Sequence, residues 1–428
     1  MGLGLRAVAT VAGSPVLDRL GMRRPVERLV YRATRDGART ATTAARAFTA
    51  ARRLAAPARQ RKVRSAGLFD LTPTDEQAML QEAFGAFGRT ALRPAASAAD
   101  AACAAPPELL ALAQELGASM LGVPEELGGA MEERSAVTTV LVAEQLAAGD
   151  PGLAVAVLAP AAVSGALSLW GDADQQARYL PPFAEDDPPA AALAILEPQP
   201  LFDPYTLQAT ATPSGDGFVL RGEKALVPRA ADAELLLVAA DVAGDGPALF
   251  LVEAGAEGLA TTPEPAMGLR AAATARVHLH DVAVPASARL APGAYADVVR
   301  RARLAWCAIA VGGAQAVLDY VIPYVNERRA FGEPIANRQA VAFAVADISI
   351  ELEGMRLATL RAAARADQGK DFAREVAIAR RLCTEHGTAI GSQGVQLLGG
   401  HGYVKEHPVE RWYRDLRTTG VAEGALLA

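Results

Sequence analysis

The chain has 428 residues, 51% of them apolar and 5% aromatic, and its net charge at pH 7 is −6. This length supports two or three domains with a large core, and the composition excludes a disordered or fibrous protein. The net acidic charge gives no reason to expect a nucleic-acid partner. The three cysteines lie far apart in the sequence, so we expect no disulfide framework and a reducing, cytoplasmic location.

The first 66 residues differ in charge from the rest of the chain. Residues 1–65 carry 15 Lys/Arg and 3 Asp/Glu, whereas the remainder carries 27 basic and 45 acidic residues. No secretory signal is evident, and Pro25 and the Ala/Arg-rich segment 38–55 predict two short helices. Residues 1–66 therefore read as a basic arm. It either binds an anionic membrane surface or partner, or it is a tail that is solvated or packed on its own body.

Residues 67–188 have the pattern of a helical domain. Thr74 and Gln77 have the spacing of a capping box at the start of a helix. Further helices are predicted at 108–116, 134–146 and 151–171. The last of these has 21 residues without a charge, which is long enough to span a bilayer. Its small side chains and the internal Pro160 favour a buried core helix instead.

Two further regions follow. From about residue 190, short aliphatic runs alternate with Gly/Pro/Asp clusters, which is typical of antiparallel strands in a small barrel or sandwich. These strands are predicted at 191–195, 217–220, 234–239, 249–252, 274–279 and 282–284. Beyond Pro285, long helices with apolar stripes are predicted at 295–328, 340–368 and 371–398. The expected fold class is α+β, with a helical domain at 67–188, a β domain at 189–292 and a helical bundle at 293–428.

Several stretches in this order resemble the acyl-CoA dehydrogenase family. They are Val-Pro-Glu-Glu-Leu-Gly-Gly at 123–129, Met-Gly-Leu-Arg at 267–270 with Asp-Val-Ala-Val-Pro at 281–285, Arg-Arg-Ala-Phe-Gly at 328–332, and the run from 396 to 424. The resemblance covers about residues 68–428. It implies a four-helix C-terminal bundle and an FAD enzyme that desaturates an acyl-CoA or acyl-carrier-protein thioester. It also implies an electron-transferring flavoprotein as reoxidant.

The resemblance places the chemistry in the C-terminal segment. Glu423 matches the carboxylate that removes the α-proton, a task that requires desolvation to raise the pKa of a carboxylic acid. The alternative is a surface glutamate in a frayed end. Arg303 matches an arginine near the thioester–pantetheine chain, or is one more solvated charge. Gly424, next to the base, is expected to contact the substrate, where backbone N–H groups can support the enolate oxygen.

A second set of positions matches residues that reach the FAD of the neighbouring subunit. Arginine supplies fixed donors to phosphate, and glycine allows close backbone approach. Because such a half-site is useful only beside a partner's half-site, a homo- or hetero-oligomer is expected. The matching residues are Arg328, Phe331, Gln339, Gln396, Gly399 and Gly400.

The β-domain half of the flavin site departs from the family pattern. Leu196 and Phe202 stand where the family has hydroxyl residues, and Leu226 replaces the aromatic that packs on the flavin. Pro228 replaces another hydroxyl residue and has no N–H. The resemblance implies a final helix with further flavin contacts, and four residues of the sequence follow Gly424. The contacts to a neighbour's FAD are therefore retained, and those to the chain's own FAD are eroded.

Three interpretations follow from this asymmetry. In the first, the chain is an active dehydrogenase that holds FAD chiefly through backbone contacts. In the second, it is a flavin-poor subunit that completes the FAD site of a paralogue. In the third, it is a non-catalytic membrane-docking scaffold on this fold. No metal site is predicted, because the five histidines have no zinc spacing and Cys383-x-x-His386 is half a site.

Overall fold

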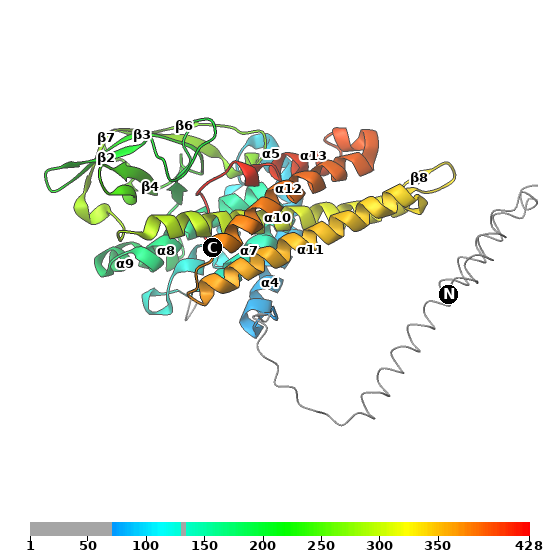
Figure 1. The fold of residues 1–428 in the computed structure, drawn as a ribbon, viewed down its shortest axis with the longest axis horizontal. Coiled ribbons are helices and arrows are strands. Elements are labelled where there is room, and N and C mark those ends of the chain that lie inside the picture. The colour runs from blue at the N-terminus through cyan, green and yellow to red at the C-terminus, as the bar shows by residue number, and fades with distance from the viewer. Residues whose placement is uncertain (1–70, 130–133) are drawn as a thin grey trace, which may run out of the picture. The chain divides into compact units, whose positions relative to one another are not determined.

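Helices, a β-sheet and further long helices follow one another along the chain (Figure 1). The computed structural model describes residues 71–129 and 134–428. The helices and the membrane contact expected of the arm at 1–66 lie outside these residues. The expected order of a helical, a β and a second helical region is confirmed.

The first helical region begins where the sequence predicts. The Thr74 hydroxyl accepts from the Gln77 N–H, and the Gln77 side chain accepts from the Thr74 N–H, which completes the capping box at α4. A π-helical turn at 88–92 joins α4 to α5. The helices of this region are α4 (Asp75–Phe87), α5 (Arg93–Ala102), α6 (Pro107–Glu115), α7 (Ala136–Gly149), α8 (Pro151–Trp170) and α9 (Ala173–Tyr179).

Helix α8 is a core helix. Asp150 caps its N-terminus, and Pro151 occupies the first turn, where its missing N–H has no intrahelical partner to lose. Two of the described helices, α8 and α10 (Ala294–Glu327), are long and apolar enough to span a membrane. Of the most apolar 18-residue stretch of each helix, 89% is buried inside the protein for α8 and 78% for α10. The apolar stretch at 151–171 therefore packs against other elements of the same chain, as the sequence predicts.

The middle region is one seven-stranded sheet with the order β1-β4-β2-β3-β7-β6, and β5 pairs with β4. A tight turn of two residues, Gly215 and Asp216, joins β2 to β3 and is closed by the pair Ser214↔Gly217. The aliphatic side chains of the sheet, α8 and the start of α10 form one core. The strands are β1 (Ala191–Ala194), β2 (Thr210–Ser214), β3 (Gly217–Pro228), β4 (Leu235–Val242), β5 (Gly246–Glu253), β6 (Leu259–Pro263) and β7 (Thr274–Pro285).

The sheet differs from the prediction in two respects. Most strand pairs are antiparallel, as expected, but β4 runs parallel to both β1 and β2. The long connections between these strands permit parallel pairing, since only a short hairpin forces neighbours to run in opposite directions. The sequence analysis also missed β2 and β6. Both are five residues long and mostly exposed, so they lack a continuous aliphatic run.

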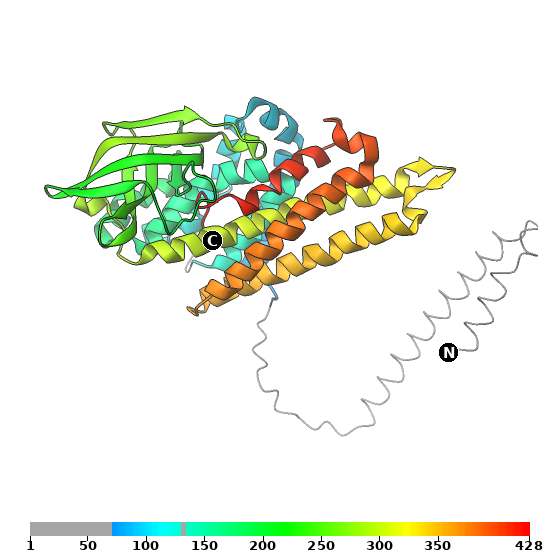
Figure 2. The same cartoon turned by 45° about the horizontal axis from the view of Figure 1, so that its top comes forward.

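The C-terminal region contains three long helices and a short one. Helix α7 packs against α10 and α11, so the first and last helical regions form a continuous layer (Figure 2). A small hairpin follows α10. The elements are α10 (Ala294–Glu327), β8 (Arg329–Ala330), β9 (Glu333–Pro334), α11 (Gln339–Asp367), α12 (Ala373–Leu398) and α13 (Val409–Asp415).

The last residues are part of the core rather than a frayed end. Residues 424–428 are all buried, and Leu426 packs in the cluster formed by α4, α7, α8 and α10. Leu427 packs in the core of the sheet instead. This segment therefore lies where the helical layer meets the sheet, and it carries Glu423 into that junction.

Candidate active site

Strand β1 and helix α10 hold the C-terminal segment in place. Gly424 forms an antiparallel bridge with Ala194, and the Ala425 N–H donates to the Leu193 carbonyl at 3.2 Å. The Trp306 indole N–H donates to the Gly424 carbonyl at 2.8 Å. Glycine is required at 424 because φ is +73° and a Cβ would lie 2.7 Å from that of Ile195. The residue next to the predicted base is thus a fixed backbone anchor.

Two arginines from different helices bind the Glu423 carboxylate. Arg303 on α10 donates from Nε to both carboxylate oxygens at 3.0 Å and from Nη2 to Oε1 at 2.7 Å. Arg380 on α12 donates from Nη2 to Oε1 at 3.0 Å and to the Ala422 carbonyl at 2.8 Å. Glu423 is only 8% exposed. Its carboxylate therefore lies in a buried cluster with two positive charges.

Burial and charge compete within this cluster. Burial lowers the pKa of the Arg380 guanidinium, and the neighbouring Glu423 carboxylate opposes this effect. Burial also acts to lower the pKa of Arg303, but its hydrogen bonds to Glu423 and the charge of that group raise it on balance. A desolvated carboxylate was expected from the sequence. The structure adds two guanidinium partners that stabilise its negative charge.

Glu423 also lines a cavity of about 260 Å³ between the sheet and the helices. This volume lies just below the roughly 300–1,000 Å³ typical of small-molecule sites. Most of the lining side chains are apolar, so the cavity suits a small planar or short-chain group. Its walls include Leu196, Leu226, Pro228, Met267, Trp306 and Glu423.

One wall consists of the positions where the flavin contacts depart from the family pattern. Leu226 has a φ of +50°, and its N–H donates to the Glu264 carboxylate at 2.8 Å. The Ala225 N–H donates to the Leu196 carbonyl at 2.8 Å. The backbone N–H groups of Leu226 and Ala225, two donors near the lost hydroxyls, are therefore already bonded within the chain. This wall offers apolar surface to a ring system and few free donors.

A buried ion pair lies behind this wall. The Lys224 ammonium is 2.7 Å from the Glu197 carboxylate, and both side chains are almost fully buried. Glu197 also accepts the N–H groups of Gln208 and Ala209 at 2.7 and 3.0 Å. Burial lowers the pKa of Lys224 to about 8, although Glu197 opposes the shift. The pair joins the segment containing Leu196 to strand β3.

A second polar cluster supports the opposite wall. Asp415, at the end of α13, accepts the Leu269 N–H at 2.7 Å, and Arg414 donates to the Met267 carbonyl at 2.9 Å. Arg414 also forms a two-point ion pair with Asp100 of α5 at 2.9 and 3.0 Å. Burial, assisted by the charge of Asp150, raises the pKa of Asp415 to about 8. The Arg-Asp sequence at 414–415 therefore fixes the wall at 267–269.

The six positions expected to reach a neighbour's FAD lie elsewhere. All six are exposed, and Phe331 is 95% exposed, in the turn between β8 and β9. They fall in two segments, one near β8 and one near the C-terminal end of α12. Both segments lie at the end of the long helices that is farther from the sheet (Figures 1 and 2). The structure therefore brings Glu423, Arg303 and Gly424 together and separates them from Arg328, Phe331, Gln339, Gln396, Gly399 and Gly400.

Two residues of this site have no signature in the sequence. Trp306 anchors Gly424, and Arg380 completes the pairing of Glu423. Neither residue could be recognised from the sequence around it, because each interaction joins segments more than 40 residues apart. Cys383 of the half site is fully buried, and His386 lies 2.8 Å from Glu351.

Comparisons with known proteins agree with this architecture. Residues 74–187, 192–282 and 296–426 match the N-terminal, middle and C-terminal domains of acyl-CoA dehydrogenases, respectively. The short-chain specific acyl-CoA dehydrogenase of Bos taurus mitochondria is 33% identical over 357 residues, covering 81% of this chain and 86% of that one.

The chain belongs to the acyl-CoA dehydrogenase family. Among solved structures, this family member is similar to butyryl-CoA dehydrogenase from Megasphaera elsdenii, with a TM-score of 0.77 and 27% identity over 83% of this chain and 96% of that one. It is also similar to PigA in a complex with FAD, with a TM-score of 0.76, 26% identity and the same coverage. The resemblance seen in the sequence is therefore confirmed.

Proposed function

We propose that the chain catalyses FAD-dependent α,β-dehydrogenation of an acyl-CoA, or acyl-carrier, thioester. The observation that carries this proposal is the position of Glu423. Its carboxylate lines the same apolar cavity as Leu196, Leu226 and Pro228, the positions that correspond to flavin contacts in the family. A proton acceptor and a ring-binding wall on one cavity are the two components that the reaction needs.

The residues present suit a flavin ring held mainly by packing. The cavity wall is apolar, and the exposed Gly399 and Gly400 leave open space where a Cβ would stand, so a phosphate chain can approach their backbone. Bound FAD would supply the acceptor for the hydride that leaves the β-carbon. This chain supplies the cavity for the ring and, from a second copy, the exposed edge for the dinucleotide.

The chain's own residues carry the proton transfer. Glu423 removes the α-proton as the double bond forms, and Arg303 and Arg380 hold its carboxylate beside the cavity. Protonation removes the negative charge to which both guanidiniums are bonded, so their hydrogen bonds to Glu423 weaken during the reaction. The arginines therefore position the base and stabilise its charged form. We assign Arg303 primarily to Glu423 rather than to the pantetheine chain.

The six exposed residues support an oligomer in which each copy completes another's FAD site. A paralogue can take the place of the second copy, and an electron-transferring flavoprotein is the reoxidant that we propose. A flavin-poor partner subunit is a second candidate function, because the Leu226 and Ala225 N–H groups are already bonded inside the chain. The two functions differ in whether the isolated chain binds FAD.

The visible spectrum of the purified chain tests this difference. A flavin band at about one FAD per chain, with acyl-CoA-dependent dye reduction, supports the dehydrogenase. A colourless protein that added FAD does not restore would refute it in favour of the partner subunit. In the active form, Glu423→Gln should retain flavin and lose turnover, because the amide cannot accept the α-proton. Unchanged turnover would remove Glu423 from the mechanism.

A further inference from the structure

A cluster of three metal-binding side chains lies in the loop that follows Gly400. His401 belongs to the short helical turn η8 (Gly399–Tyr403), and Glu406 and His407 precede α13. One ligand atom from each side chain lies within 4.8 Å of the other two. Within residues 71–129 and 134–428, these three side chains form the group of His, Cys, Asp or Glu residues whose ligand atoms are close enough to share one metal ion.

The donor set is that of a transition-metal site. Imidazole and carboxylate ligands suit Zn²⁺, and three protein ligands leave a fourth position for water. Donors around a tetrahedral Zn²⁺ at about 2.0 Å lie roughly 3.3 Å apart. The His401 Nδ1 and the nearer Glu406 carboxylate oxygen are 3.9 Å apart. Both side chains are exposed, so small rotations about their side-chain bonds can bring the two atoms to the separation that a tetrahedral ion requires.

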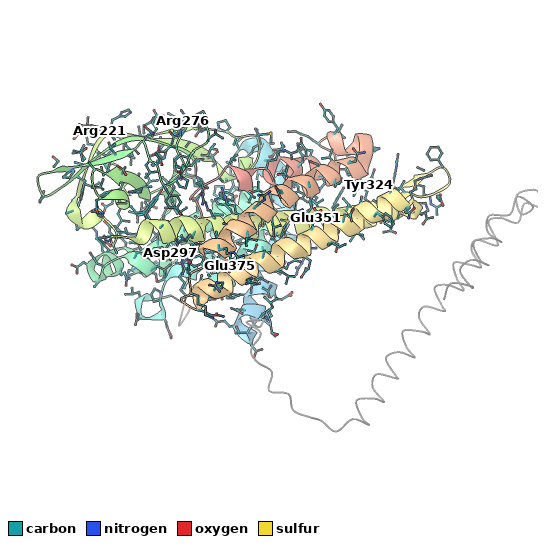
Figure 3. The ribbon with its side chains drawn as sticks, in the orientation of Figure 1. Arg221, Arg276, Asp297, Tyr324, Glu351 and Glu375 are labelled. Atoms are coloured by element: carbon teal, nitrogen blue, oxygen red, sulfur yellow. The ribbon has the colours of Figure 1, made fainter. Side chains whose placement is uncertain are left out.

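The third ligand is already oriented. The Tyr320 hydroxyl of α10 lies 2.6 Å from Nδ1 of His407, which leaves Nε2 as the free nitrogen. The His407 ring also packs edge-to-face against the Tyr320 and Tyr324 rings, with centroids 6.0 and 5.7 Å away. Tyr324 projects from α10 toward the end of α12 (Figure 3). A hydrogen bond to the non-ligating nitrogen is the support that metal-binding histidines normally have.

We propose that His401, Glu406 and His407 bind one divalent transition-metal ion of the Zn²⁺ class. The ion would join η8 to the segment that enters α13 and would close a seven-residue loop directly after Gly399 and Gly400. This site is separate from the cavity at Glu423, and it does not depend on the proposed dehydrogenase activity. The sequence spacing of the three ligands did not reveal this site, because the tyrosine that orients His407 comes from helix α10.

Calorimetric titration of the tag-free, full-length chain with Zn²⁺ tests the proposal. We expect one equivalent to bind with a micromolar dissociation constant and to raise the melting temperature, because the ion binds only the folded loop. The double variant His401→Ala/Glu406→Gln changes two exposed side chains and should remove this binding. Tyr320→Phe keeps all three ligands and should weaken binding by about 10- to 100-fold.

His386→Ala is the matched control. His386 also lies beside a carboxylate, Glu351, but outside the cluster, so this variant should bind Zn²⁺ as the wild type does. The melting temperature without metal shows whether each variant is folded. The proposal is overturned if the wild type binds no Zn²⁺ at about 1 mM free ion. Equal binding by the wild type and the double variant would also overturn it.

Discussion

Arg380→Gln is the substitution that most directly tests how Glu423 is held. The change removes one of the two positive charges at the carboxylate and keeps a polar side chain of similar length. Arg303 retains its two-point contact, so the carboxylate stays beside the cavity. Because one positive charge fewer then stabilises the carboxylate, proton transfer from the substrate to Glu423 becomes more favourable.

The size of the effect follows from the geometry. The Arg380 Nη2 lies 3.0 Å from the Glu423 Oε1, and both side chains are largely buried. With the charges about 4 Å apart and an effective dielectric constant of about 20, the lost attraction is about 4 kcal/mol. Arg303 remains and water can enter the vacated space. We therefore expect the acid limb of the kcat/KM profile to move upward by about one to two pH units, at 1.36 kcal/mol per unit.

The assay is acyl-CoA-dependent dye reduction by the FAD-loaded enzyme between pH 5 and 9. Arg381→Gln is the matched control, since the neighbouring Arg381 is exposed and pairs with Glu385 on the surface. This control should leave the acid limb in place. An acid limb that stays fixed, or moves to lower pH, in Arg380→Gln would show that Arg380 does not act on the base.

Three further predictions concern stability. Glu197→Gln leaves Lys224 buried without its charge partner and should cost about 3–5 kcal/mol of unfolding free energy in urea. Adding Lys224→Met to Glu197→Gln should recover most of it, because the glutamine oxygen can still accept from the Gln208 and Ala209 N–H groups. Because burial lowers the pKa of Lys224 from 10.5 to about 8, the unfolded chain binds more protons between these pH values. The stability contribution of this group should therefore rise with pH across that window and be lost as pH falls toward 8, and Lys224→Met should abolish this dependence. Gly424→Ala forces a Cβ toward Ile195 at positive φ and should lower the melting temperature, whereas Gly400→Ala, in open space, should not. An equal effect of the two glycine substitutions, or a Lys224→Met variant with the wild-type pH dependence, would contradict this reasoning.

The sequence predicted the helices well because their signals are local. The capping box at Thr74 and Gln77, the 21-residue uncharged run that becomes α8, and the apolar stripes of α10 to α12 each lie within one element. The sheet was harder to predict. Strands β2 and β6 are short and mostly exposed, and the parallel pairing of β1 with β4 depends on where a strand enters the sheet rather than on its own residues.

The candidate site was predictable only in part, because some of its contacts join segments that are far apart in the sequence. The C-terminal signature indicated Glu423 and Gly424, and the altered flavin contacts at positions 196 and 226 stay a prediction. Arg380 was not found, because its contact with Glu423 crosses between helix α12 and the C-terminal segment. The cluster at His401 and His407 was missed because a tyrosine from α10 orients one of its ligands.

The attachment of the C-terminal segment to β1 has a consequence for local unfolding. Most chain ends exchange their amide hydrogens rapidly because they open independently of the core. Here the Ala425 N–H is bonded to β1 and the Gly424 carbonyl to Trp306, so the segment cannot detach without disturbing both the sheet and α10. Its amide protons should exchange as slowly as those of β1. The base at Glu423 thus belongs to the same cooperative unit as the first strand, and a substitution that loosens that strand would also loosen the base.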